Sequence, residues 1–246
     1  MNEADLPIRC LLLAAGLGTR LRPITDQKPK CLVDVGGRPI LEWWLDHLES
    51  IQCEKVIVNT HYHAQQVSQF LNNTESKHMQ IVERYEHKLL GTAGSLLANA
   101  DFFQGSTGVL IHADNATDTD LSKLIHAHRN RPTYCLLTML TFETDTPQSC
   151  GIVEIDSDGV VQNFYEKITN PPGNRANGAV YVFEQQLLDI LKASEEQPHD
   201  FSKEVLSRLI GRIYTCHTLD QFIDIGTPES LNKARQIWTT SDPLAL

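Results

Sequence analysis

The chain has 246 residues, 41% hydrophobic and 21% charged, which is ordinary for a globular protein able to bury a sizeable core. Its formal net charge of −10 argues against non-specific nucleic-acid binding, so we expect no nucleic-acid partner. No apolar run approaches the ~18 residues of a membrane span. The acidic N-terminal residues Met1–Asp5 argue against a secretory signal peptide, so we expect a cytoplasmic protein without a membrane partner.

The first half of the chain alternates apolar runs with helical patterns, which indicates a mostly parallel sheet covered by helices on both faces. The helix expected to begin at Pro39 is supported by an apolar stripe of Ile40, Trp44, Leu45 and Leu48. Strands are expected near 8–13, 55–59, 79–83 and 108–112, and helices near 39–50, 64–72, 92–100 and 120–129.

The middle of the chain, 134–183, is rich in strand patterns separated only by loops, and Asp158-Gly159 predicts a hairpin. We therefore expect one domain over 1–240, with a mostly parallel half near 8–130, a mixed or antiparallel half near 131–240, and a loose tail at 241–246. Further strands are expected near 134–141, 151–155, 160–165, 178–183 and 212–216, and helices near 185–194, 201–210 and 228–238.

Cysteine and histidine spacing predicts neither a disulfide framework nor a zinc site. The six cysteines are scattered without a C-x-x-C pair, which indicates reduced, buried thiols. His126 and His128 are two apart on an expected helix and so point to different faces. We interpret that pair, and the pair His61 and His63, as surface or structural residues.

A glycine-rich turn follows the first expected strand and is followed in turn by a run of basic residues. Gly16 and Gly18 allow a sharp bend whose backbone N–H groups can approach a phosphate. Arg20, Arg22, Lys28 and Lys30 follow closely, so we predict a polyphosphate site here. The turn lacks the third glycine of a dinucleotide fingerprint and the Gly-Lys-Ser/Thr of a P-loop.

The string Leu13–Thr25, L-A-A-G-x-G-T-R-L-x-P-x-T, with the downstream pair Pro29-Lys30, resembles the sugar-1-phosphate nucleotidyltransferases, which make nucleotide-sugars from an NTP. The resemblance implies a Rossmann-like three-layer α/β/α sandwich with a mixed, mostly parallel central sheet. It implies catalytic roles for Arg20 and Lys30. It also implies nucleotide binding by Leu13, Ala14, Ala15, Gly16, Gly18, Thr19, Gly91 and Thr92, although Thr92 could equally cap a helix.

Two aspartates are candidate ligands for the Mg²⁺ that phosphoryl chemistry on an NTP needs. Asp114 follows the apolar run 108–113, at the carboxyl end of a strand, where ligands bind in open α/β sheets. A turn or helix cap is its competing interpretation. Asp224 opens D-I-G-T-P-E, which resembles a late element of the family. Because Thr227 or Gly226 would cap the helix beginning at Pro228, Asp224 remains available for metal.

We expect the half near 8–130 to bind the nucleotide and the half near 131–240 to bind the sugar phosphate. Sugar-phosphate binding is carried over from the resemblance to Gly151, Glu166, Lys167 and Asn177. Lys167 would meet the sugar phosphate and Glu166 would accept hydrogen bonds from sugar hydroxyls. From the residues alone, an adjacent pair such as Glu166-Lys167 is usually a solvated strand end, so this assignment depends on the resemblance. The competing interpretation of Gly151 is a turn glycine.

The expected reaction is nucleotidyl transfer from an NTP to a sugar-1-phosphate, giving an NDP-sugar and pyrophosphate. GTP and mannose-1-phosphate are favoured because Leu90–Gly94 and Ile225–Glu229 resemble that branch of the family. The alternatives are uridylyl, thymidylyl or cytidylyl transfer, another acceptor such as phosphocholine, and, from another class, a non-catalytic nucleotide-sugar-binding regulatory protein. The sequence predicts no oligomeric state.

Overall fold

The computed structural model describes residues 6–239, so Met1–Asp5 and the predicted tail 241–246 lie outside the described residues. The chain divides into two compact units that are interleaved in sequence. Unit 1 contains the chain up to Arg9, Leu90–Ile111 and Leu121–Leu219. Unit 2 contains Cys10–Leu89, His112–Asp120 and the chain from Asp220. The predicted division into halves near residue 130 stays a prediction.

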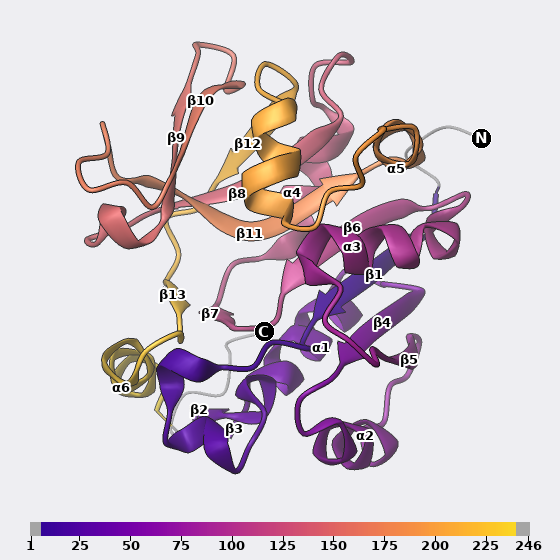
Figure 1. Ribbon diagram of the computed structural model, residues 1–246, viewed down its shortest axis with the longest axis vertical. Coiled ribbons are helices and arrows are strands. Elements are labelled where there is room, and N and C mark those ends of the chain that lie inside the picture. The colour runs from indigo at the N-terminus through magenta and orange to yellow at the C-terminus, as the bar shows by residue number, and fades with distance from the viewer. Residues whose placement is uncertain (1–5, 240–246) are drawn as a thin grey trace. The chain divides into compact units, whose positions relative to one another are not determined.

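Unit 2 is built around parallel strands that follow the predicted alternation. The strand β1 (Ile8–Leu13), which enters this unit at Cys10, lies beside β4 (Lys55–Thr60), and β4 pairs in parallel with β5 (Gln80–Tyr85). Five successive residues of β4 from Val56 are buried, as expected of a strand covered on both faces. The helices α1 (Ile40–Ser50) and α2 (Ala64–Asn72) precede β4 and β5 in the chain (Figure 1).

The helix α1 buries the predicted stripe, including Ile40, Trp44 and Leu48, at 1% exposure or less. It begins at Ile40, because Pro39 is extended at φ −58°, ψ 140° and belongs to the short strand β3 (Arg38–Pro39), which pairs with β2 (Asp34–Val35). The expectation that Pro39 is the first helical residue is therefore wrong by one position.

Unit 2 also contains elements that the sequence pattern did not predict. Two three-residue strands, β7 (Asn115–Thr117) and β13 (Phe222–Asp224), pair antiparallel. The last helix, α6 (Pro228–Ile237), starts where predicted, and its N-cap is Thr227, whose Oγ1 accepts a hydrogen bond from the backbone N–H of Ser230. Thr227 and Ser230 form a capping box, so Asp224 takes no part in capping.

Unit 1 is dominated by antiparallel strands. The strand β11 (Arg175–Phe183) pairs antiparallel with β6 (Thr107–His112), β8 (Leu137–Glu143) and β9 (Gly151–Ile155). The strands β9 and β10 (Val161–Glu166) form the hairpin predicted at Asp158-Gly159 (Figure 1), while β12 (Ile213–His217) pairs in parallel with β8. The sheet is therefore mixed.

The helices of unit 1 are α3 (Gly91–Ala98), α4 (Leu121–Arg129), α5 (Gln185–Lys192) and a π-helical segment over Phe201–Leu206. Its core contains Phe103, Tyr181, Phe183 and Phe201, all fully buried. His128 of α4 is buried with its Nδ1 2.8 Å from Thr138 Oγ1. This is a structural role, one of the two that we expected for this histidine. Among the described residues, every helix is too short or too polar to span a lipid bilayer.

Candidate functional site

The glycine turn lies between β1 and a 3₁₀ helix over Thr19–Leu21 in unit 2. Gly18 has φ +62°, and a Cβ there would lie 2.8 Å from Thr25 Cγ2, so this position requires glycine. Thr25 Oγ1 donates to the Gly18 carbonyl at 2.7 Å. A Cβ on Gly16, in contrast, would meet nothing within 4 Å, so the backbone there is open to an approaching ligand.

The nucleotide-binding prediction for the turn covers both buried and exposed residues. Gly16, Thr19 and Arg20 are exposed, whereas Ala14 and Ala15 are buried. The N–H groups of Ala14 and Ala15 donate to the side chain of Asn59, so these two N–H groups are engaged within the protein. The nucleotide-binding role of the turn, including Leu13, Ala14 and Ala15, stays a prediction.

Four charged side chains that the sequence predicted for one site converge within unit 2. Lys30 Nζ lies 2.6 Å from Asp114 Oδ2 and 3.3 Å from Asp224 Oδ1. Arg20 Nη2 lies 3.7 Å from Asp224 Oδ2. Lys30 is largely buried and Arg20 is exposed, so the cluster has an inner and an outer cation.

Backbone pairing brings the two aspartates together. In the β7–β13 ladder Asp224 is opposite Asn115, and the Ile225 N–H donates to the Asp114 carbonyl at 3.0 Å. On the other side, the Ala113 N–H donates to the carbonyl of Leu13 at the start of the glycine turn. The cluster and the turn are thus held by main-chain hydrogen bonds.

The charges in the cluster stabilise one another. Burial by itself would raise the pKa of Asp114, but the Lys30 ammonium and His112 outweigh it and lower the pKa to about 2. Burial likewise favours a lower pKa for Lys30, yet the two carboxylates raise it. At neutral pH these interactions keep Asp114 as a carboxylate and Lys30 as an ammonium.

Gly226 is a site residue that sequence reasoning did not single out. A Cβ at this position would lie 2.9 Å from Arg20 Nη2 and 3.0 Å from Asp224 Oδ1. The side chains of Arg20 and Asp224 thus occupy the space that any larger residue would need. The glycine in D-I-G-T-P-E was the available signal.

Gly91 and Thr92 lie at the start of α3 in unit 1, as predicted. Gly91 has φ +76°, and a Cβ there would lie 2.4 Å from the His199 carbonyl oxygen, so only glycine fits. The Ala93 N–H donates to the same carbonyl. Thr92 lies inside the helix and does not cap it; its Oγ1 accepts from the Phe201 N–H at 2.7 Å. The Thr92 hydroxyl proton remains available as a donor.

Gly151, Glu166 and Lys167 come together in unit 1. Gly151 is opposite Glu166 in the β9–β10 ladder, and a Cβ on Gly151 would lie 2.8 Å from Glu166 Oε2. Lys167 Nζ lies 3.4 Å from Glu166 Oε1. Lys167 has φ +53°, an unfavourable conformation for a side-chain-bearing residue, held by its N–H donating to the Cys150 carbonyl.

Asn177 lies on β11, the strand that pairs with β9 at Ala176. Its Nδ2 donates to Tyr181 Oη at 2.7 Å and its Oδ1 accepts from the Ala179 N–H at 2.9 Å. These bonds support an irregularity in the β11–β8 register, where Ala179 has φ +53°. Both polar atoms of Asn177 are therefore used in shaping the strand.

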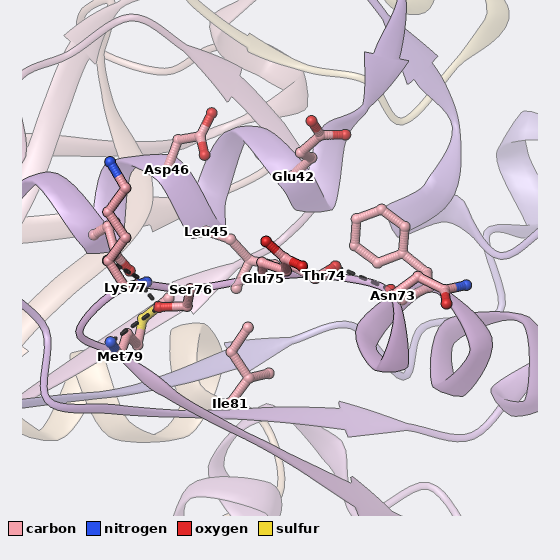
Figure 2. Close-up of a pocket in the computed structure, with 12 residues that line it drawn as sticks. Glu42, Leu45, Asp46, Asn73, Thr74, Glu75, Ser76, Lys77, Met79 and Ile81 are labelled. Carbon is pink, nitrogen blue, oxygen red and sulfur yellow. Dashed lines mark hydrogen bonds between the residues drawn. The ribbon is translucent and has the colours of Figure 1, made fainter.

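A cavity of about 480 Å³ lies elsewhere in unit 2, beside α1 and the loop before β5 (Figure 2). None of the predicted site residues lines it. Its wall includes Glu49, whose carboxylate accepts hydrogen bonds from the Ser76 hydroxyl and from the N–H groups of Lys77 and His78. Glu49 thereby fastens this loop to α1, a structural role.

Comparison with known proteins gives consistent matches. A family model described as "Nucleotidyl transferase" matches residues 9–241. The chain is 30% identical over 226 residues to the mannose-1-phosphate guanylyltransferase catalytic subunit beta of Drosophila pseudoobscura pseudoobscura, covering 90% of this chain and 60% of that protein. It is 26% identical over 235 residues to the UTP–glucose-1-phosphate uridylyltransferase of Synechocystis, covering 89% and 60%. The chain thus spans about 60% of the length of these relatives.

A solved structure resembles the whole chain. It is that of a candidate glucose-1-phosphate thymidylyltransferase from Bacillus anthracis, crystallised with sucrose, at 22% identity and a TM-score of 0.85. The match covers 97% of this chain and 98% of the other. This likeness confirms the predicted fold class, a three-layer α/β/α sandwich with a mixed, mostly parallel central sheet.

Proposed function

Because the chain belongs to the nucleotidyl transferase family, we propose that it transfers a nucleotidyl group from an NTP to a sugar-1-phosphate, releasing pyrophosphate. The observation that carries this proposal is the convergence of Arg20, Lys30, Asp114 and Asp224 beside the glycine turn. A triphosphate needs cations and a metal at one place. This cluster supplies two cations and a pair of carboxylates, which we propose as the metal ligands.

In the proposed reaction, an oxygen of the sugar-1-phosphate attacks the α-phosphorus of the NTP in line, and pyrophosphate leaves. A phosphate monoester is already anionic near neutral pH, so the reaction requires no general base. The protein then contributes positioning and charge neutralisation. Lys30 and Arg20 would offset the negative charge that develops on the α-phosphate and on the departing pyrophosphate.

Asp114 and Asp224 fit a Mg²⁺ site because their carboxylates converge on a single cation, the Lys30 ammonium. Magnesium is usually held by one or two carboxylates together with water and substrate phosphates, and this donor set matches that requirement. When bound, the ion would neutralise phosphate charge.

For the acceptor, we propose that Lys167 binds the sugar phosphate and that Glu166 accepts hydrogen bonds from sugar hydroxyls. The left-handed backbone of Lys167 supports this assignment, because such unfavourable conformations cluster at ligand-binding positions. We propose GTP and mannose-1-phosphate as substrates, on the similarity to the Drosophila guanylyltransferase subunit. The six cysteines all lie in the described residues and form no disulfide there, which supports the proposed cytoplasmic location.

The test is pyrophosphate release from GTP, UTP, CTP and dTTP, each with a panel of sugar-1-phosphates, with and without Mg²⁺. We expect Mg²⁺-dependent release that is fastest with GTP and mannose-1-phosphate. Fastest release with another pair would revise the substrates alone. If no pair gives pyrophosphate release and the chain still binds a nucleotide-sugar, the enzymatic function is refuted. The alternative, a non-catalytic regulatory protein, then takes its place.

The metal assignment has its own test. We expect Asp224→Asn to lower turnover by ~10²-fold or more and to raise the Mg²⁺ concentration needed for half-maximal activity. The matched control is Asp158→Asn, which makes the same change in the exposed β9–β10 turn. Full Mg²⁺-dependent activity in Asp224→Asn would refute the assignment of Asp224 as a ligand.

A further inference from the structure

A buried asparagine links the glycine turn to a buried glutamate inside unit 2. Asn59, near the end of β4, is 2% exposed, and its Oδ1 accepts from the N–H of Ala14 at 2.7 Å and of Ala15 at 3.3 Å. Its Nδ2 donates to Glu86 Oε1 at 2.8 Å. One side chain thus contacts both residues that precede Gly16.

The partners leave the Asn59 amide a single satisfactory orientation. Two backbone N–H donors face one end of the amide and require its oxygen, whereas a carboxylate faces the other end and requires its NH₂ group. A flipped amide would place donor against donor and acceptor against acceptor. The Glu86 carboxylate therefore fixes which atom the turn meets.

Glu86 is itself held rigidly, directly after β5. It is 7% exposed, its N–H donates to the Thr60 carbonyl at 2.8 Å, and its own carbonyl lies 2.8 Å from His61 Nδ1. Burying a carboxylate is unfavourable unless hydrogen bonds compensate for the lost hydration. The preceding residues of the strand, Ile57 and Val58, are apolar and buried. If position 59 only had to fill the core, an apolar residue would be sufficient there. A buried polar network at this place indicates a positioning task.

We propose that Asn59, oriented by Glu86, is a positioning residue that holds the turn at Ala14–Ala15 in the conformation that receives the nucleotide. The proposal rests on the proposed function, since it assigns the turn to the NTP. When the turn is already ordered before the NTP binds, less of the binding free energy is lost to ordering it. Disrupting the network should therefore weaken NTP affinity and leave the affinity for the sugar phosphate unchanged.

The experiment reverses the polarity of the network. Asn59→Asp sets a carboxylate against Glu86, and we expect the KM for NTP to rise at least ~10-fold while the KM for sugar phosphate stays within ~2-fold. In the double variant Asn59→Asp/Glu86→Gln, the new carboxylate at position 59 can still accept from the Ala14 N–H. It can also accept from the new amide at position 86. We expect this double variant to recover NTP affinity to near the level of Glu86→Gln alone.

A matched control is Asn163→Asp in unit 1. Asn163 Nδ2 donates to Glu154 Oε2 at 3.0 Å on an exposed strand pair, so the substitution creates the same carboxylate–carboxylate contact away from the turn. We expect no change in the KM for NTP. A rise in both KM values in Asn59→Asp, or failure of the double variant to recover, would overturn the proposal.

Amide hydrogen exchange of the wild-type chain tests the same proposal without any variant. We expect slow exchange at Ala14 and Ala15 and fast exchange at Gly16 and Leu17, in the absence of nucleotide. Fast exchange at Ala14 and Ala15 in a chain that binds NTP would overturn the positioning role alone. A wild-type chain that binds no NTP would overturn both this role and the proposed function.

Discussion

Lys30 Nζ lies 2.6 Å from Asp114 Oδ2, although 84 positions separate the two residues along the chain. The same ammonium reaches Asp224, which is 194 positions away. Burial strips hydration from the Lys30 ammonium, and the two carboxylates offset that loss enough to raise its pKa. Lys30, a predicted catalytic cation, therefore contacts both predicted metal ligands. Its replacement tests both predictions.

We expect Lys30→Met to lower pyrophosphate release by ~10²-fold or more, because a preorganised charge beside the phosphates is lost. Circular dichroism should show a folded chain. Lys123→Met, which removes the same charge from an exposed position on α4, should keep wild-type activity. Wild-type rates in folded Lys30→Met would contradict the role of Lys30.

Replacement of Lys167 separates its charge from its backbone conformation. Lys167→Met and Lys167→Gly both remove the ammonium, so we expect each to raise the KM for sugar phosphate ~10-fold without altering the KM for NTP. Glycine adopts φ +53° freely, whereas a side chain there costs roughly 1–2 kcal/mol. The glycine variant should therefore unfold at higher urea than the methionine variant. An unchanged KM for sugar phosphate in both would exclude Lys167 from the acceptor site.

Three glycine-to-alanine variants measure how tightly α3 approaches His199. Gly173→Ala should be neutral, since no atom lies within 4 Å of the added Cβ and its φ is ordinary. Gly105→Ala, at φ +69° in open space, should lose roughly 1–2 kcal/mol of unfolding free energy. Gly91→Ala has the same conformational cost plus a 2.4 Å clash with the His199 carbonyl, so it should lose more than Gly105→Ala. Equal losses of unfolding free energy in Gly91→Ala and Gly105→Ala would show that the loop at His199 moves to accommodate the added Cβ.

His47 predicts a pH dependence of stability. Burial lowers its pKa below 6.5, against the opposing effect of the Thr117 carbonyl that faces its Nε2 at 3.0 Å. The unfolded chain therefore binds a proton before the folded chain does, and the contribution of His47 is complete above pH 6.5 and declines as pH falls below it.

Urea unfolding between pH 7.5 and 5.5 measures this effect. The amide of His47→Gln can donate to Thr117 without titrating, so this variant should lose less stability than the wild type over that range. His126→Gln, an exposed substitution on α4, should behave like the wild type. An identical pH slope in His47→Gln and wild type would contradict the prediction.

Local signals predicted the parts of the fold that depend on local pattern. The apolar stripe of α1, the strand β4 and the Asp158-Gly159 hairpin were predicted from short segments, and the structure confirms them. Of the two predicted caps of α6, Thr227 and Gly226, the structure has Thr227. Asp114 and Asp224 were predicted one by one as charged residues, and the structure brings both to Lys30.

Features that depend on distant partners could not be predicted in this way. The strands β7 and β13 have three residues each and exist because they pair with one another, so neither carries a periodic signal. In the sequence, Asn59 is one polar residue in an apolar strand, and only the structure shows its hydrogen bonds to Ala14 and Glu86. The left-handed conformation of Lys167 has no signature in its own residue type.

The interleaving of the two units has a consequence for vectorial synthesis. All of unit 1 precedes Asp220 in the chain, whereas β13 and Asp224 of unit 2 come after it. On the ribosome, the glycine turn and Asp114 are therefore translated long before the strand that completes their neighbourhood. Unit 1 can acquire its structure first, and the cluster of Arg20, Lys30, Asp114 and Asp224 is complete only when β13 emerges and pairs back onto β7.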